Sequence, residues 1–235
     1  MYGRGDAGPR LSADTALSSV LVVVLEHLGL PHVLLTRRSG TRTHSGEVAF
    51  PGGKNEPGET DVEAALREAQ EEVGLPADSG IEVVGQLERL VSQHGLVVTP
   101  IVALGPALAG VPGASQVAFL PRLEPNPDEV EVTRPLADVF PHWVAFSHTH
   151  APVQSIFHVP LWPFLLETDA HTTQPMPPTG PAAMYLHHFR TTFGAEEEEY
   201  DVWGQTFSII MHLAALIYDR EPEFDVKPAS VSPKL

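Results

Sequence analysis

Residues 60–74 carry the start signal, the apolar stripe and the stop signal of one helix. Thr60 and Glu63 stand at the spacing of a capping box, which begins a helix. Gly74 can take the left-handed conformation that ends a helix, and Pro76 prevents continuation. At about 100° per residue, one side of this helix is apolar and is expected to bury against a sheet. The apolar side consists of Val62, Ala65, Leu66, Ala69 and Val73.

Three carboxylates share another side of the same helix. Glu68, Glu71 and Glu72 fall within an arc of about 100° by helical geometry. Like charges at this spacing destabilise a helix by roughly a few tenths of a kcal/mol per pair. A hard dication reverses that effect, and magnesium prefers oxygen ligands and bridges carboxylates to substrate phosphates. Manganese also suits such a site. The alternative interpretation is an ordinary solvated acidic face.

The segments around this helix predict strands and one further helix. The β-branched run 19–25, the turn residue Gly29 and the apolar residues 33–36 predict strand, turn and strand. Further strands are predicted at 81–91, 96–104, 115–120 and 129–133. A second helix is predicted at about 203–219, because its apolar residues recur at helical spacing. Those residues are Phe207, Ile210, Met211, Ala214 and Ile217.

The length of 235 residues suits a single buried core with some elaboration. Residues 1–16 are expected to be a flexible arm, 17–222 a single domain, and 223–235 a tail. Within the domain, 141–200 is rich in proline and histidine and is expected to be an irregular insertion with a few strands. This segment could alternatively serve as a dimerisation or partner-binding lobe.

The chain from Gly53 to Leu75 resembles the Nudix box. Gly53, Glu59 and the run Arg67-Glu68-Ala69-Gln70-Glu71-Glu72-Val73-Gly74-Leu75 match that signature at every position. The resemblance implies the α/β Nudix fold, a mixed β-sheet sandwiched between helices. It also implies hydrolysis of nucleoside diphosphates linked to another group.

Residue roles follow from the resemblance. Glu68, Glu71 and Glu72 match the metal ligands, for Mg²⁺ with Mn²⁺ as a substitute, and Glu59 and Arg67 match the ion pair that orients their helix. The backbone of Pro51-Gly52-Gly53 can approach a phosphate closely. A carboxylate must take the proton of the attacking water. The candidates are Glu71, Glu72 and, in the downstream segment 125–130, Glu129.

A second pattern upstream resembles the coenzyme A diphosphatase branch of this family. It comprises residues 34–39, Arg42, Gly46 and 50–53, although the loop between Ser39 and Arg42 is one residue shorter than in that branch. The resemblance implies cleavage of coenzyme A, or an acyl form of it, to 3′,5′-ADP and 4′-phosphopantetheine. Arg38 and Arg42 are candidate clamps for phosphate, because guanidinium groups match phosphate oxygens. Their alternative role is to pair with surface carboxylates.

Composition restricts the partners. The chain has no cysteine, which excludes disulfides and thiolate chemistry. The formal net charge of −16 disfavours nucleic acids and anionic membranes. We therefore expect a small nucleotide substrate and a cytoplasmic location. The oligomeric state is left open, with a homodimer as one option.

Several alternatives remain open at this point. The same chemistry could act on ADP-ribose, a dinucleotide or a dinucleoside polyphosphate, and the fold could serve as a non-catalytic binding protein. His44 is a candidate substrate contact. His148 and His150, with His142 or His158, form a candidate zinc site, against the simpler interpretation of polar surface residues.

Overall fold

The computed structural model describes residues 16–27, 29–39, 46–75, 79–91, 96–105, 153–176, 184–193 and 198–226. The elements are β1 (Leu17–His27), β2 (Leu30–Arg38), β3 (Val48–Ala49), β4 (Gly52–Lys54), α1 (Asp61–Val73), β5 (Glu82–Gln86), β6 (Leu90–Val91), β7 (Val97–Leu104), β8 (Val153–Pro160), the 3₁₀ helix η3 (Trp162–Leu165), β9 (His171–Met176), β10 (Met184–Phe193), β11 (Glu198–Trp203) and α3 (Gly204–Tyr218). None of the helices in these ranges is long and apolar enough to cross a bilayer.

The central sheet is mixed and is built around β1. Its strand order runs β3-β2-β1-β7-β5, while β4 pairs with β1, β6 with β7 and β8 with β2. β1 and β2 form an antiparallel hairpin whose turn contains Gly29 at a φ of 81°, a conformation that glycine adopts without strain. β1 and β7 are parallel. Parallel neighbours need a long crossover, and α1 lies in the chain between them.

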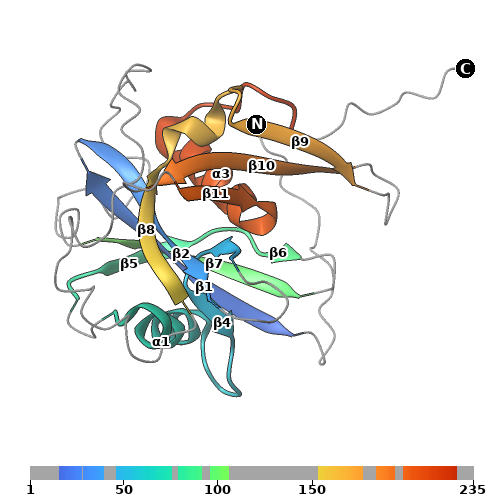
Figure 1. Cartoon of the computed structure of the whole chain (residues 1–235). Helices are drawn as coiled ribbons and strands as arrows, with labels where there is room; N and C mark the ends of the chain where they lie inside the picture. The colour runs from blue at the N-terminus through green and yellow to red at the C-terminus, as the bar shows by residue number, and fades with distance from the viewer. Residues whose placement is uncertain are drawn as a thin grey trace, which may run out of the picture.

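Two hydrophobic layers cover the two faces of this sheet. Alternate residues of β1 point to opposite faces, as expected for a strand. Leu21 and Leu25 pack with Ala65 and Ala69 of α1. Val22 and Val24, which point to the other face, instead pack with α3, η3 and strands β10 and β11. Figure 1 shows α1 on one side of the sheet and α3 with the sheet β9–β10–β11 on the other. The predicted α/β fold is confirmed.

The predicted helices lie where the sequence indicates. Thr60 is the N-cap of α1, and its hydroxyl accepts from the Glu63 amide while the Glu63 carboxylate accepts from the Thr60 amide. Gly74 ends α1 at a φ of 67°. The apolar residues named for the second helix, Phe207 to Ile217, are buried in α3. Local end signals and periodicity were therefore sufficient to place both helices.

The segment 141–200 is more regular than the sequence suggests. Its described residues form β8, η3, β9, β10 and part of β11. β8 extends the central sheet by pairing with β2 from His32 to Arg38. β9, β10 and β11 form a separate three-stranded sheet. This part of the chain supplies a core layer: the strands expected in it are present, and its described residues are more regular than expected.

The expected boundary of the C-terminal tail also needs correction. Phe224 and Val226 pack against the core cluster on the α3 side. The Glu223 amide donates to the Leu165 carbonyl at 2.8 Å. Residues 223–226 therefore belong to the folded body. The strands predicted at 115–120 and 129–133 and the arm 1–15 lie outside the described residues.

Candidate functional site

The carboxylates of α1 lie beside a tight turn of β4. Gly52 and Gly53 of β4 pair with Val20 and Ser19 of β1, so the turn is fixed to the central strand. A Cβ atom on Gly52 would lie 2.4 Å from the Ser19 carbonyl oxygen. A Cβ atom on Gly53 would lie 2.5 Å from the Glu68 carboxylate. Gly52 requires glycine, because a Cβ atom there would collide with the backbone of β1, whereas a Cβ atom on Gly53 would displace the Glu68 carboxylate.

Glu72 is the most enclosed of the three predicted ligands. Its side chain is 9% exposed, and its Oε2 accepts from the Gly52 amide at 3.1 Å. Burial raises the pKa of the Glu72 carboxyl, while the Gly52 amide and the Arg38 charge lower it and Glu68 and Glu71 raise it. The net shift is upward, so the enclosed negative charge is not fully balanced by the protein. A cation beside it would supply the missing compensation.

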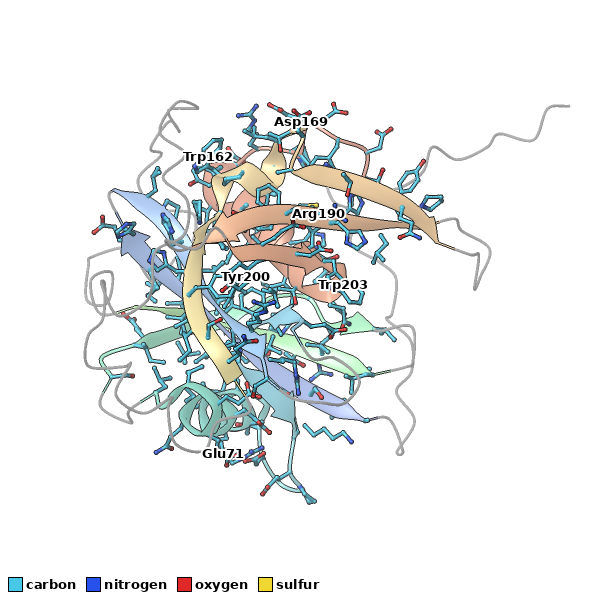
Figure 2. The ribbon with its side chains drawn as sticks, in the orientation of Figure 1. Glu71, Trp162, Asp169, Arg190, Tyr200 and Trp203 are labelled. Carbon is cyan, nitrogen blue, oxygen red and sulfur yellow. The ribbon has the colours of Figure 1, made fainter. Side chains whose placement is uncertain are left out.

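Glu68 and Glu71 lie on the outer side of Glu72. The Glu68 side chain is 18% exposed and accepts from Nη1 of Arg67 at 3.0 Å. The Glu71 side chain is 61% exposed and lies 3.6 Å from the same nitrogen. Figure 2 shows Glu71 on α1, with Tyr200 and Trp203 across the central sheet from it. Glu71 is thus the carboxylate of the three that is most open to solvent.

The ion pair predicted for the box orients this helix. Arg67 donates from Nε to Oε1 of Glu59 at 2.7 Å and from Nη2 to Oε2 of Glu59 at 3.1 Å. Nη2 also donates to the Lys54 carbonyl at 3.1 Å. Hydrogen bonding with Arg67 lowers the pKa of the Glu59 carboxyl and raises the pKa of the guanidinium. One side chain thereby connects β4, the loop before α1, and α1 itself.

A second polar network, absent from the sequence prediction, fixes the start of α1. Asp61 accepts from Asn55 Nδ2 at 2.7 Å, from Ser19 Oγ at 3.3 Å and from Arg89 Nη2 at 2.9 Å. Burial raises the pKa of the Asp61 carboxyl, but its hydrogen bonds, including one from Thr99, outweigh burial and lower the pKa. The signal available in the sequence was an acidic residue in the first helical turn, which also favours the helix dipole.

The donor set suits a hard dication in its chemistry. Carboxylate oxygens of α1 and backbone groups of β4 lie side by side at the turn, and magnesium keeps several waters and needs only one or two protein carboxylates. In the described part of the chain, no three acidic or histidine side chains lie close enough together to hold a metal ion, so Glu68, Glu71 and Glu72 are not gathered into a three-ligand site. The enclosed Glu72 and the close approach of Glu68 to Gly53 fit a metal that is shared with substrate phosphates.

Of the two arginines predicted to contact phosphate, only Arg38 lies within the described residues. It is exposed at the end of β2, its charge acts on Glu72, and its backbone pairs with Gly46 and Glu47. Arg42, His44 and Glu129 lie outside the described residues. An arginine that the sequence analysis did not single out, Arg37, lies over the Tyr200 ring with its Cζ 5.1 Å from the ring centre.

The histidines expected to bind zinc are only partly described. His158 is buried in β8, with its Nδ1 2.9 Å from Nδ1 of His32. Its ring centre lies 4.9 Å from that of His27. His142, His148 and His150 lie outside the described residues. Burial lowers the pKa of His32 to about 3, and the neighbouring His158 and His27 add to that effect. His32 is therefore neutral near pH 7.

Comparisons with known proteins identify the domain. The NUDIX domain matches residues 16–151. The chain is 34% identical over 207 residues to an uncharacterized Nudix hydrolase, NudL, of Pectobacterium atrosepticum, covering 86% of this chain and 83% of that protein. It is 41% identical over 128 residues to Nudix hydrolase 3 of Caenorhabditis elegans, covering 52% of this chain and 49% of that protein.

Other matches are shorter. The chain is 56% identical over 78 residues to NudL of Yersinia enterocolitica, which covers 32% of this chain and only 40% of that relative. A solved structure of a Nudix hydrolase from M. Smegmatis, RenU, is 26% identical with a TM-score of 0.34, over 39% of this chain and 59% of that one. The sequence matches therefore establish the relationship, and the matched NUDIX domain contains the carboxylates of α1.

Proposed function

The chain belongs to the NUDIX domain family, and on that premise we propose that it hydrolyses the diphosphate of a nucleoside diphosphate linked to another group. The observation that carries this proposal is the contact between the β4 turn and α1. The Gly52 amide donates to Glu72 and Gly53 lies against Glu68, so the glycine turn and the acidic helix face are in direct contact. The paired Glu59 and Arg67 hold that helix in its orientation.

Glu68, Glu71 and Glu72 would hold the divalent metal, Mg²⁺ with Mn²⁺ as a substitute. A bound dication neutralises phosphate charge and lowers the pKa of a water ligand. The residues of the chain do the rest. The enclosed Glu72 favours a cation in its pocket, because burial raises its pKa when no cation is present. The Gly52 amide donates to Glu72, which holds the glycine turn against the carboxylates.

A carboxylate must accept the proton as water attacks phosphorus. Glu71, the most exposed of the three, and Glu72, the most enclosed, remain the candidates within the described residues. Glu129 remains the third candidate. The proton moves from the attacking water to the carboxylate oxygen, and the diphosphate bond breaks with the bridging oxygen leaving on the second phosphate.

We further propose coenzyme A, or an acyl form of it, as the substrate. The support is the upstream pattern of residues 34–53 that resembles the coenzyme A diphosphatase branch. Arg38 at the end of β2 acts on Glu72, which puts a guanidinium within electrostatic reach of the metal carboxylates. Arg42 would provide the second guanidinium. The products would be 3′,5′-ADP and 4′-phosphopantetheine, or its acyl form.

The decisive experiment incubates the full chain with coenzyme A and Mg²⁺ in oxygen-18 water, followed by mass spectrometry of the products. We expect 3′,5′-ADP and 4′-phosphopantetheine, with the label on the phosphate that was attacked. A parallel panel contains ADP-ribose, a dinucleotide and a dinucleoside polyphosphate. Faster turnover of any of these would reject coenzyme A as the preferred substrate, and no turnover of any would reject the hydrolase.

The arginine clamp has its own test. Arg42→Ala should raise the KM for coenzyme A more than the KM for the analogue that lacks the 3′-phosphate, because only the former offers that phosphate to a guanidinium. Equal effects on the two substrates would remove Arg42 from the proposal without affecting the hydrolase.

A further inference from the structure

A groove of about 550 Å³ lies on the face of the sheet opposite α1. It is bounded by the second half of α3 and by the segment that joins β5 to β6. Apolar side chains from α3, from the β5–β6 segment and from β7 line it. Its volume lies in the range of small-molecule binding sites. The main apolar contributors are Leu87, Leu90, Pro100, Ile209 and Leu216.

The floor of this groove is in line with the glycine turn. Gly52 of β4 pairs with Val20 of β1, and Val20 pairs with Pro100 of β7. The Leu87 amide donates to the Pro100 carbonyl at 3.0 Å. Adjacent strands lie about 4.8 Å apart, so Pro100 is about 10 Å from Gly52 across the sheet. Val20, which lies between them, is only partly buried and packs on the α3 side.

The charges around the groove select against phosphate. Glu88, Asp219 and Glu221 contribute carboxylates to its lining. The one guanidinium of the lining, Arg220, is bound by the Glu223 carboxylate. A phosphate placed here would face several like charges, whereas an amide N–H would find carboxylate acceptors. The chemistry of the groove therefore fits an uncharged chain that is apolar and carries N–H donors.

We propose that this groove binds the uncharged arm of the diphosphate substrate, an amide-bearing aliphatic chain. The phosphorylated nucleoside then stays on the Arg38 side of the glycine turn. This inference rests on the proposed hydrolase, because it assigns an orientation to the substrate of that site. The substrate has an anionic part and an uncharged part. The orientation gives each part its own place, because the groove lies only two strands away from the glycine turn.

A direct binding experiment tests the groove apart from catalysis. Pantetheine, which is the arm without its phosphate, is titrated into the isotope-labelled full chain while the amide signals and the His212 ring signals are followed by NMR. We expect shifts at His212, Leu216 and the segment 87–90. Titration with 3′,5′-ADP should leave these signals unchanged. No shift with pantetheine, or shifts there with 3′,5′-ADP, would overturn the proposal.

A matched pair of variants tests the groove during turnover. Leu216 and Val91 are both exposed apolar residues, at 56% and 53%, but only Leu216 lines the groove. Leu216→Asp should raise the KM for coenzyme A about tenfold with little change in kcat, because a charge replaces an apolar contact. Val91→Asp should leave the KM unchanged. An unaltered KM in Leu216→Asp, or equal effects in both, would overturn the groove assignment.

The two proposals fail in different ways. If the wild type hydrolyses nothing, while pantetheine still shifts the groove signals, the hydrolase is wrong and the binding site stands as a separate site. If the wild type cleaves coenzyme A, while the groove signals and Leu216→Asp show no effect, the groove assignment is wrong and the hydrolase stands.

Discussion

Both oxygens of the Glu59 carboxylate accept from Arg67, at 2.7 Å from Nε and 3.1 Å from Nη2. This two-bond geometry defines the angle between the glycine turn and α1, because Arg67 also binds the Lys54 carbonyl. Lysine cannot reproduce it, since an ammonium group is a single point of charge. The pair therefore acts by positioning the carboxylates that follow it on the helix.

Arg67→Lys should consequently lower kcat/KM about 10- to 100-fold, which is the usual effect of losing a group that orients metal ligands. The apparent affinity for Mg²⁺, measured by activity against metal concentration, should fall as well. An unchanged metal dependence together with reduced activity would mean that Arg67 contacts the substrate instead of orienting the helix.

The individual carboxylates of α1 can be tested by Glu→Gln substitutions at 68, 71 and 72. Each should reduce the Mg²⁺-dependent rate on the order of 100-fold, because an amide is a weaker ligand for a hard dication. Glu63→Gln is the matched control on the same helix, since glutamine maintains a capping box. Full activity in the Glu72→Gln variant would contradict the metal site.

Gly53→Ala should abolish activity while the protein remains folded. The added methyl carbon would lie 2.5 Å from the Glu68 carboxylate, so this carboxylate must move away from the turn. Gly85→Ala is the control, because a Cβ atom there meets nothing within 4 Å. Circular dichroism checks the fold, and the rate is measured as the formation of 4′-phosphopantetheine from coenzyme A. Wild-type rates in Gly53→Ala would show that the contact between turn and helix is unimportant.

Because His32 is buried, we expect the free energy of unfolding to fall as the pH is lowered. The pKa of His32 falls from 6.5 to about 3 in the folded protein, mainly through burial. The unfolded chain therefore binds the extra proton as the pH drops below 6.5, and the free energy of unfolding decreases progressively until about pH 3. The expected total loss is a few kcal/mol, given about 1.4 kcal/mol per pKa unit.

His32→Phe should flatten that profile, as measured by urea unfolding between pH 7 and 4, whatever its effect on stability at neutral pH. His212→Gln provides the control, because His212 is exposed on α3. A slope that persists unchanged in His32→Phe would assign the acid sensitivity to another group.

Local signals predicted the site better than they predicted the far side of the fold. The capping box of Thr60 and Glu63, the stop at Gly74 and the glycine turn all lie within one short segment, so their geometry follows from nearest neighbours in the chain. Asp61 escaped prediction because its partners Ser19 and Arg89 are brought together only by the sheet.

The strands β8 to β11 were not placed from the sequence for a related reason. Their proline content suggested irregular structure, yet Pro160 comes at the end of β8 and Pro163 lies in the first turn of η3. Both positions tolerate a missing amide hydrogen. The pairing of β8 with β2 joins residues 32–38 to 153–160, and nothing local in the sequence indicates such a distant partner. Periodicity alone cannot supply that information.

That pairing also has a consequence for how the protein is made. During synthesis, β2 emerges from the ribosome long before β8, and until then one edge of the hairpin has no strand to pair with. Unpaired edges of apolar strands invite association between chains. Completion of the central sheet must therefore wait for translation of β8, and until then this edge of β2 is open to pairing with another chain.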